Sequence, residues 1–576
     1  MFEWRDKQDS QIVTEVMQDN ARLKSIRLPL EPVFDLVTKL FMPRTWDMKK
    51  STKPGSEPYG VHIYNHVPSE ARRKFSAGFV SQTATRGDDA EQSWINFAAP
   101  RRKTMEVDRV KNYMQEAAEQ ERAGFAQSTF YHDTAYQPQV ADASVLWGVM
   151  TIDDDLVRDR LVFRRRDPRN HWFGIDQFGD IDVDHFDHTF TAKSLLEKFD
   201  EDKLSEEIVK EAKREDGKNP YQEYKVIEAI YKNGDRIAGS ENELDKEFIR
   251  FYILKANERN KKSTLIEKKG LDWRPSVLRI GERLDSGYPL TMAMDALTAA
   301  TLGNTLAKHE IMGSAAMVQP PRLIHENLRA QILRHNLNPA SNTYYSNAEE
   351  KIEYLSQKID PRLADTLLQR KDDAVNERFY VNFFELFTRL QAQGGTPPTA
   401  TQIRQAVGER IGQLTAVIDA SEDLSLEPAV DAIWTHETDA GRMPDPPQEL
   451  LDEAKSDQVR ILNIFNGNLA QLKRTVRLNQ SSVEALAIIR EMKDIAPSAL
   501  VIVKFKKLLE KMLVNRIGQD TIFNEQEVEQ IEAGLAELQE QERQMVQAER
   551  MSKVIPPMTK DAVDPESPAA LVATAA

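Results

Sequence analysis

The chain has 576 residues, of which 40% are hydrophobic and 29% are charged, and this balance excludes both a disordered chain and an integral membrane protein. It contains no cysteine, which excludes disulfide bonds, thiolate zinc sites and cysteine nucleophiles. The net charge of −15 argues against a protein that grips DNA tightly, because such proteins neutralise phosphates with Lys and Arg, but it allows a protein that handles DNA without gripping it.

The N-terminal part of the chain is predicted to be a layer of helices. Residues 1–50 suit one or two helices that end at Pro43, and residues 69–85 and 108–130 continue with apolar residues at helical spacing. Residues 1–20 lack the apolar run of a secretory signal, so we expect the protein to stay in the cytoplasm where it is made.

The middle of the chain changes to a β-rich pattern. Short apolar runs between residues 144 and 190 are separated by turn signals such as Gly179-Asp180, and they predict a β-meander. Thr191 is expected to cap a helix that runs to Phe199. Further expected elements are an exposed helix over residues 201–218, strands over 224–230, 248–254 and 265–267, and a hairpin turn at Asn233-Gly234.

From Thr291 onward the chain is predicted to be mainly helical. Residues 291–316 are rich in Ala, Gly and Thr, which permit close packing, and would span about 39 Å as one helix. Asp295, Lys308 and Glu310 lie within this stretch and exclude a membrane span, because each charge is costly in lipid. We therefore interpret the stretch as a buried or interface helix.

The remaining sequence alternates helices with breaks. Pro320-Pro321 ends the first helix, and a second long helix is expected over residues 360–390. Thr399 followed by Gln402 is typical of a capping box that opens a third helix. The apolar face of that helix comprises Ile403, Val407, Ile411, Leu414 and Ile418. The other expected features are an irregular segment over 322–355, a Pro-rich break at 444–447, a last helix over 525–553 and a disordered tail beyond Pro556.

Sequence motifs of common enzymes are absent. Residues Gly234–Ser240 come nearest to a phosphate-binding Walker A loop, but they lack its lysine. No Gly-x-Ser-x-Gly, His-Glu-x-x-His or Gly-x-Gly-x-x-Gly pattern occurs in the sequence. We therefore expect neither a packaging motor nor another enzyme, and no cofactor.

One cluster of acidic and histidine residues offers ligands for a divalent ion. It comprises Asp180, Asp182, Asp184, His185, Asp187 and His188. Alternate residues of a strand point to opposite faces, so Asp182 and Asp184 would share one face, and His185 and Asp187 the other. We therefore interpret the cluster as the solvated edge of a hairpin, with a metal site as the alternative.

One basic cluster stands out in this acidic chain. It comprises Arg158, Arg160, Arg164, Arg165, Arg166 and Arg169, and only Asp159 and Asp167 oppose it locally. Two interpretations stay open: the arginines face phosphate groups, or they pair with acidic residues of a neighbouring chain, which the acidic total favours. The Trp and Phe residues nearby are expected to belong to the core and not to a base-stacking surface.

A series of short motifs is distributed in a characteristic order along most of the chain. In the β-rich region these are Ser93-Trp-Ile-Asn-Phe97, His171-Trp-Phe-Gly-Ile-Asp-Gln-Phe-Gly-Asp-Ile-Asp-Val183, Phe190-Thr-Ala192 and Phe199. Further on they are Trp273-Arg-Pro-Ser-Val-Leu-Arg279, Ser286-Gly-Tyr-Pro289, Asp295, Leu302, Asn304, Pro320-Pro321, Pro398-Thr-Ala-Thr-Gln-Ile403, Leu426-Glu-Pro428, Gly441-Arg-Met-Pro444 and Phe465-Asn-Gly-Asn-Leu-Ala470. Because these motifs share their order over most of the chain with the head-to-tail connector, or portal, family of podovirus-like phages, the sequence resembles this family. The Gly287-Tyr288 order departs from the family, where Tyr-Gly is more frequent.

The resemblance implies a mainly helical α+β fold: a portal-like subunit with an α/β wing, a two-helix stem, a small clip and a helical crown, which assembles as a ring of about twelve copies. The implied parts are the wing over 1–284, the stem helices over 285–316 and 359–390, the clip over 317–358, a tunnel loop over 391–398, a wing helix over 399–450, the crown over 451–553 and a disordered tail over 554–576.

The resemblance also implies a function that is not enzymatic. The ring would be the channel at a capsid vertex for genome packaging and ejection, in the virion and, during assembly, in the host cytoplasm. The implied partners are the large terminase and later the tail adaptor, the major capsid and scaffolding proteins, and double-stranded DNA that passes without sequence-specific binding, with no membrane. The implied site residues are Gln391, Gln393, Gly394, Gly395 and Thr396 in the tunnel loop, and Arg322, His325, Arg329, Arg334, Tyr344 and Tyr345 in the clip.

The pattern of the residues supports this assignment, because two long helices flank an irregular segment, as a stem and clip require. Two other functions stay open. One is a metal-dependent nuclease or hydrolase that uses Asp182, His185 and His188. The other is a tail-tube or scaffold component that has no DNA channel.

Overall fold

The structure, a computed structural model, describes most of residues 1–478, which form one compact unit. The described residues are 4, 7–43, 62–84, 86, 94–99, 101, 104–132, 135–155, 157–214, 219–234, 242–256, 262–318, 322–323, 353–354, 361–385, 412–451, 461–470 and 473. They combine helices and antiparallel sheets, in agreement with the predicted α+β class.

The predicted N-terminal helices are confirmed, and one more is present. Pro29 and Pro32 lie in the first turns of the two helical segments that follow the first helix, a position where proline is favourable. The two prolines therefore divide the helical stretch expected over residues 1–50. The unpredicted helix, α5, is short and buried on nearly all sides, so its sequence shows no helical periodicity. The elements are α1 (Asp9–Arg27), η1 (Leu28–Leu30), α2 (Glu31–Phe41), α3 (Val67–Thr83), η3 (Thr104–Glu106), α4 (Asp108–Gln127) and α5 (Tyr136–Ala143).

The β-rich region forms two antiparallel sheets, so the single meander predicted between residues 144 and 190 is wrong in part: only its later strands belong to a sheet of consecutive strands. One sheet has five strands in the order β4-β5-β6-β7-β8, and the other has three in the order β3-β2-β9. The short turn η4 (Pro168–Asn170), capped by the Asp167 carboxylate, redirects the chain between the two sheets. The strands are β2 (Gly148–Asp155), β3 (Arg160–Arg166), β4 (His171–Ile175), β5 (Ile181–Thr191), β6 (Glu223–Lys232), β7 (Phe248–Leu254), β8 (Thr264–Leu271) and β9 (Ser276–Leu278).

The outer edge of the three-stranded sheet is closed by a side chain. The Thr129 hydroxyl, in the loop after α4, accepts a hydrogen bond from Phe163 N at 2.7 Å and donates one to Phe163 O at 2.9 Å. These bonds satisfy backbone groups of the edge strand β3, which would otherwise be open to pairing with another chain.

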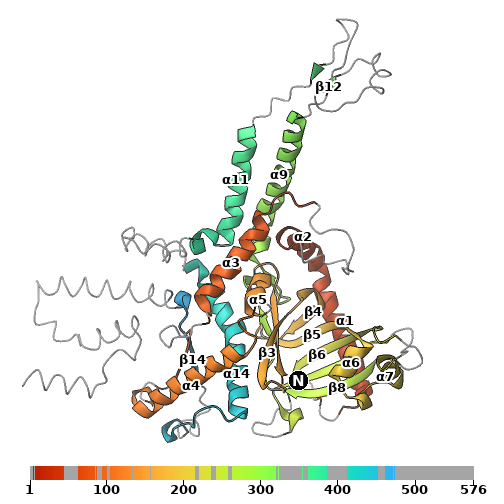
Figure 1. Ribbon diagram of the computed structural model, residues 1–576, viewed down its shortest axis with the longest axis vertical. Helices are drawn as coiled ribbons and strands as arrows, with labels where there is room; N and C mark the ends of the chain where they lie inside the picture. The colour runs from red at the N-terminus through yellow and green to blue at the C-terminus, as the bar shows by residue number, and fades with distance from the viewer. Residues whose placement is uncertain are drawn as a thin grey trace, which may run out of the picture. The chain divides into compact units, whose positions relative to one another are not determined.

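Helices cover both faces of the five-stranded sheet (Figure 1). On one face, Ile12, Val16 and Leu23 of α1 pack on apolar residues of the strands. On the other face, α6 (Ala192–Lys198) and α7 (Glu206–Ala212) contribute to a second core cluster. The predicted cap is confirmed, because the Thr191 hydroxyl accepts a hydrogen bond from Ser194 N at 3.2 Å.

Two predictions in this region are wrong in part. Residues 201–214 form only the turn η5 (Glu201–Lys203) and the short α7, and Ile208 and Val209 are buried, so the expected long exposed helix is absent there. Asn233 does not start a two-residue turn. Its amide donates to Leu244 O and Lys246 O, both at 2.9 Å, and so organises a longer connection that contains η7 (Glu243–Asp245).

Two long helices, α9 (Leu297–Val318) and α11 (Pro361–Arg378), pack side by side and are called the helix pair below (Figure 1). The first is preceded by the short α8 (Met292–Asp295), so helix begins at Met292 and not at the expected Asp285. The preceding residues form a turn around Gly287, whose φ of 83° suits glycine, between β10 (Glu282–Arg283) and β11 (Pro289–Leu290).

The second helix of the pair is also shorter than expected. Tyr380 has a φ of 53°, a left-handed conformation that ends an α-helix, and residues 381–385 then form a separate helical turn. The single helix predicted over residues 360–390 is therefore interrupted at this point.

The last described elements return to the body of the unit. Leu414 and Ile418 are buried, as predicted for the third helix, while Ile403, Val407 and Ile411 lie outside the described residues, as do the expected last helix and the tail. The remaining elements are the π-helical turn η9 (Glu422–Leu426), α14 (Glu427–Asp439), and the strand pairs β1 (Ile95–Ala98) with β14 (Leu462–Phe465) and β12 (Arg322–Leu323) with β13 (Glu353–Tyr354). Among the described helices, none is both long and apolar enough to cross a membrane.

Candidate functional sites

Most residues assigned to the tunnel loop and the clip lie outside the described residues. These are Gln391, Gln393, Gly394, Gly395 and Thr396 of the tunnel loop, and His325, Arg329, Arg334, Tyr344 and Tyr345 of the clip. Arg322 is described through its backbone, which pairs with Tyr354 in the β12–β13 ladder. The assignment of these residues stays a prediction.

The base of the helix pair is held by residues 62–66. The Asn304 side chain on α9 accepts hydrogen bonds from Tyr64 N at 2.7 Å and Asn65 N at 3.2 Å, and donates one to His62 O at 3.2 Å. Asn65 in turn donates to the Asp372 carboxylate on α11 at 2.6 Å. Sequence reasoning found Asn304 as part of a motif but missed Asn65 and Asp372, which are 307 residues apart in the chain.

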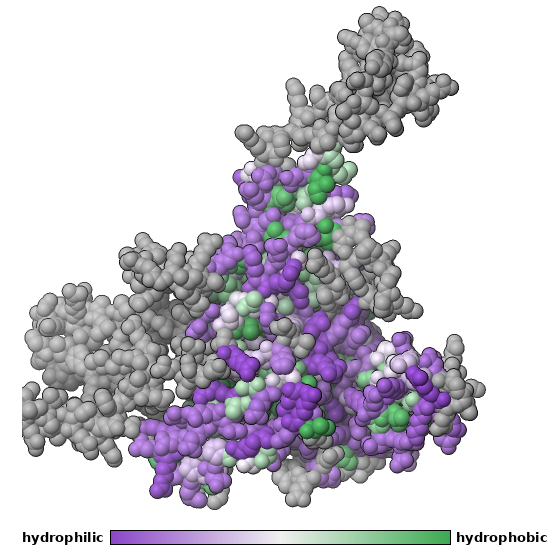
Figure 2. All heavy atoms as spheres, in the orientation of Figure 1, coloured by the Kyte–Doolittle hydropathy of each residue, from purple (hydrophilic) through white to green (hydrophobic). Residues whose placement is uncertain are grey.

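The side of α9 that points away from α11 is exposed. Ala300 and Ala307 are buried, whereas Leu302 and Met312 are 45% and 56% exposed. At about 100° per residue, Leu302 and Met312 lie on the side opposite the two alanines. Figure 2 shows hydrophobic residues at the surface of the helix pair. The outer face of α9 is defined here as Thr301, Leu302, Thr305, His309 and Met312, all of them exposed.

The two threonines of this outer face need no external hydrogen-bond partner. The Thr301 hydroxyl donates to Leu297 O at 2.8 Å, and the Thr305 hydroxyl donates to Thr301 O at 2.9 Å. Their methyl groups are therefore available for contact, and burying this part of the face would leave no hydroxyl donor unsatisfied.

At the centre of the basic cluster a buried aspartate pairs with two half-buried arginines. Asp142 of α5, 1% exposed, pairs with Arg165 of β3 at 2.5 Å and with Arg72 of α3 at 3.0 Å. Burial lowers the pKa of Arg72, and Asp142 offsets only part of that effect. Burial also acts to lower the pKa of Arg165, but Asp142 outweighs it, so the pKa of Arg165 lies above its usual range. This group links two helices to the three-stranded sheet.

Other arginines of the cluster also pair within the chain. The pairs are Arg160 with Asp155 at 3.6 Å, Arg166 with Asp153 at 3.6 Å, and Arg169 with Asp167 at 2.6 Å. These arginines and Arg165 thus have acidic partners within the chain, and the interpretation that the cluster faces phosphate groups or a neighbouring chain stays a prediction for them. It also stays a prediction for the exposed Arg158 and Arg164. The nearby aromatic residues Phe163, Trp172 and Phe173 are buried, as expected.

The Asp and His cluster does not lie on a solvated edge. Strand β5 pairs with β4 on one side and β6 on the other, and Asp184 and His185 are 3% and 0% exposed. The expectation that Asp182 and Asp184 share a face is also wrong. A bulge between β4 and β5 opposite Gly174 breaks the alternation, so the Asp182 carboxyl lies near α1, whereas Asp184 faces His171.

His171 and Asp184 form a buried, fixed hydrogen-bond chain. Trp147 Nε1 donates to His171 Nδ1 at 3.1 Å, so Nδ1 is the acceptor and Nε2 carries the ring hydrogen. His171 Nε2 then donates to the Asp184 carboxylate at 2.9 Å. All the hydrogen-bonding capacity of this imidazole is used within the core.

His185 is held on the α1 face of the sheet. Asn20 donates to His185 Nδ1 at 3.2 Å, and His185 Nε2 donates to the Tyr231 hydroxyl at 2.8 Å, which donates to Asp19 at 3.3 Å. Burial lowers the pKa of His185 to about 4, so the ring is neutral at pH 7. Asp187 lies on the same face, as predicted, where Lys24 donates to it at 2.6 Å.

His188 lies on the opposite face. Its Nε2 is 2.6 Å from Glu228 Oε2, and the Tyr252 hydroxyl donates to Glu228 Oε1 at 2.7 Å. Burial acts to raise the pKa of Glu228, but His188 and the nearby Arg250 and Lys198 outweigh it and hold that pKa well below its usual range. This carboxylate is therefore a charged structural group at neutral pH.

These positions separate the three residues proposed for a nuclease. His188 lies on the face opposite His185 and Asp182, and both histidines are already bonded to protein groups. Within the part of the chain that the structure describes, no group of three or more His, Asp or Glu side chains is arranged to hold a metal ion. The alternative of a metal-dependent hydrolase thus loses its candidate site.

Comparison with known proteins identifies one family. The model of a family described as bacteriophage head to tail connecting protein matches residues 13–523. A comparison with curated proteins finds no match. The matched residues include both sheets, the helix pair and the segments assigned to the clip and the tunnel loop.

Proposed function

Because this chain belongs to the family of bacteriophage head to tail connecting proteins, which are structural phage proteins, we propose that it is a portal subunit whose copies form a ring at one capsid vertex. Phage DNA enters the capsid through this ring during packaging and leaves through it during ejection. The observation that carries the proposal is the helix pair, in which the outer face of α9 exposes Leu302 and Met312 in the single chain.

The outer face of α9 suits a contact between copies. Leu302 and Met312 supply apolar area, and Thr301 and Thr305 have their hydroxyl groups satisfied within the helix. A contact that joins two different surfaces of identical copies closes into a ring when the rotation between copies divides a full turn. We propose that this face packs against the helix pair of the next copy, in a ring of about twelve.

The charge distribution supports passage of DNA without gripping. The chain has a net charge of −15, and most of its one basic cluster is neutralised by aspartates of the same chain. An acidic channel wall would repel phosphates, so the duplex slides instead of binding. We place Gln391, Gln393 and Gly394 at the channel as part of the tunnel loop.

The partners follow from this role. We propose that the clip, residues 317–358, contacts the large terminase during packaging and the tail adaptor afterwards. The rest of the ring contacts the major capsid and scaffolding proteins, and the mature protein resides in the virion.

The assembly itself provides the test. Native mass measurement of the purified protein should give a closed ring, and negative-stain images should show annular particles with a central hole. A tail-tube or scaffold component would give stacked tubes or no hole. A lone monomer at every protein and salt concentration would contradict the proposal.

A second experiment tests the sliding mechanism. Replacing Gln393 with Lys adds a positive charge to each copy of the tunnel loop, and we expect slower DNA packaging, most clearly at low salt, where phosphate contacts are strongest. The same change at the exposed Gln127 on α4 serves as the control. Equal packaging rates in Gln393→Lys and the wild type would contradict the proposal that DNA slides because the channel wall repels its phosphates.

A further inference from the structure

A buried carboxyl group lies where α4 meets α14. Glu121 is 0% exposed, and neither of its carboxyl oxygens has a hydrogen-bond partner within the described residues. One helical turn further along α4, a Cβ atom on Gly124 would lie only 2.7 Å from Ile433 Cγ2 and 3.3 Å from Glu437 Oε1. The two helices are therefore in direct contact beside Glu121.

The charged groups that face Glu121 are themselves acidic. They are Glu437 and Asp431, both on α14. Glu437 is kept ionised, because Arg442 donates to its two oxygens at 2.7 and 2.8 Å and Gln120 donates to it at 2.7 Å. Burial, Glu437 and Asp431 all raise the pKa of Glu121 well above its usual range, so a second negative charge here is disfavoured.

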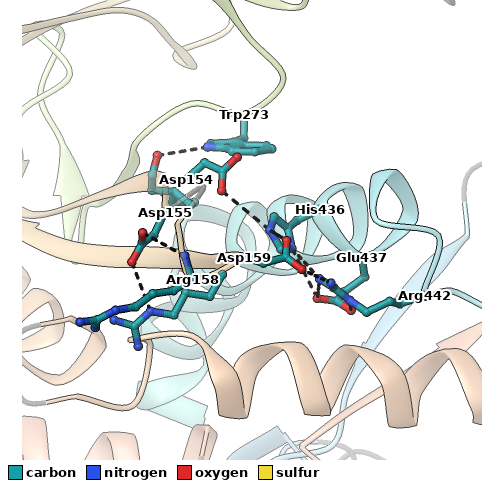
Figure 3. A network of polar contacts seen from close by, with 10 residues as sticks. Asp154, Asp155, Arg158, Asp159, Trp273, His436, Glu437 and Arg442 are labelled. Atoms are coloured by element: carbon teal, nitrogen blue, oxygen red, sulfur yellow. Dashed lines mark hydrogen bonds and ion pairs between the residues drawn. The ribbon is translucent and has the colours of Figure 1, made fainter. Parts of the chain in front are cut away.

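The same arginine extends this contact to the turn between β2 and β3 (Figure 3). Arg442 Nη1 donates to the Asp159 carboxylate at 2.6 Å. His436 Nε2 lies 3.7 Å from Asp159 Oδ1 and 3.8 Å from Asp154 Oδ1. Asp159 has a φ of 47°, so this turn is held in a conformation that is unfavourable for a residue other than glycine.

We propose that α4, α14 and the β2–β3 turn form a proton-coupled clasp, which closes only when Glu121 carries a proton and releases that proton to water when it opens. Once α14 moves away from α4, Glu121 becomes hydrated and regains an ordinary pKa of about 4.3, so it ionises at neutral pH. The O–H bond of the Glu121 carboxyl group is the covalent bond that breaks on opening, and its proton is taken up by water. The clasp does not depend on ring assembly or on the proposed portal function.

The sign of the pH dependence follows from this proton. The closed form binds one proton more than the open form at every pH between the ordinary pKa of a glutamate and the raised pKa of buried Glu121. The closed form is therefore fully favoured below that window and loses stability as pH rises through it, by about tenfold per pH unit in the closing equilibrium. The ion pairs of Arg442 act in the opposite sense only in acid, where their carboxylates become protonated.

Hydrogen exchange on the full-length protein tests the clasp. Exchange of the α14 amides, corrected for its intrinsic pH dependence, should report opening that increases about tenfold per pH unit as pH rises above the ordinary pKa of a glutamate, about 4.3, in the wild type. Glu121→Gln, which mimics the protonated acid, should remove this dependence. Glu116→Gln, on the exposed side of the same helix, should leave it unchanged. The same slope in Glu121→Gln and the wild type would overturn the proposal.

A second measurement keeps the proposal testable if Glu121→Gln does not fold. Infrared spectra of the wild type at neutral pH should contain the carbonyl band of a protonated carboxyl group. Gly124→Ala, whose added methyl group meets Ile433, should open the clasp at every pH and remove the band. A wild-type spectrum without the band would refute a protonated Glu121.

Discussion

The five-stranded sheet and the helix pair differ in how far their side chains are buried and hydrogen-bonded within one chain. In the sheet both faces are covered, and buried groups such as His171, His185 and Glu228 have polar partners within the chain. In the helix pair, α9 buries Ala300 and Ala307 but leaves Leu302 and Met312 exposed. Both faces of the sheet are covered within one chain, whereas the helix pair leaves apolar side chains exposed.

This difference separates folding from assembly. Burial of one exposed Leu or Met side chain contributes on the order of 1.5–3 kcal/mol, and a ring repeats that gain at every contact between copies. The buried hydrogen-bond chains of the sheet are costly to interrupt and gain nothing from a neighbour. Substitutions in the two regions should therefore change different measurements.

The largest expected effect is loss of the ring. Leu302→Asp combined with Met312→Asp places two charges in the proposed contact between copies, and we expect monomers in native mass measurement. The free energy of unfolding of the monomer should change by less than about 0.5 kcal/mol, because both side chains are exposed in the single chain. Gln115→Asp on α4 is the control that should still form rings. Rings of unchanged mass in the double variant would place the contact elsewhere.

The next effect belongs to the body of the monomer. Asp142→Ala leaves the half-buried Arg72 and Arg165 without their buried partner and should lower the free energy of unfolding by about 3–5 kcal/mol. Asp155→Ala breaks the more exposed pair with Arg160 and should cost only about 0–1 kcal/mol. Urea unfolding measures both variants. Equal losses would mean that burial of the Asp142 group contributes little.

Acid should weaken the sheet through His185. In the folded protein, burial lowers the pKa of the His185 imidazole to about 4. As pH falls, the unfolded chain therefore takes up a proton first, near the ordinary histidine pKa of about 6.5. Stability is thus present above that pH and lost as pH falls towards 4, by roughly 3 kcal/mol in total. In the unfolding free energy measured against pH, His185→Gln should flatten this part of the curve. His309→Gln on the outer face of α9 should retain the wild-type slope.

The smallest effect concerns the contact between residues 62–66 and the helix pair. Asn304→Ala removes the hydrogen bonds that hold residues 62–66 against α9, and should cost about 1–2 kcal/mol in the free energy of unfolding. Thr305→Ala, which removes only a bond within its own helix, is the matched control. A loss no larger than that of the control would show that residues 62–66 are held by other contacts.

Local patterns predicted much of the chain correctly. Apolar spacing located α1, α3 and α4, the strands β6 and β7, and the helix that contains Leu414 and Ile418. Thr191 was recognised as a cap because its hydroxyl bonds a backbone group close by in the chain. The order of short motifs indicated the family that residues 13–523 match.

Several of the wrong predictions depend on partners distant in the sequence. The Asp and His cluster was expected at an edge, but β5 lies between β4 and β6, so its polar side chains are buried and bonded. The bulge opposite Gly174 reversed the expected direction of Asp182. The interruption of the helix at Tyr380 is not accompanied by a glycine or proline that would predict it.

The sequence by itself determined many of the helices and strands, the absence of cysteine chemistry and the family, because these follow from spacing, composition and the order of motifs along the chain. Only the tertiary structure decided which charges are free. Arg165 finds its partner in Asp142 on another element, whereas Glu121 is buried beside α14 and has no hydrogen-bond partner within the described residues. Ion pairing and burial depend on distances in space, which neither composition nor periodicity contains.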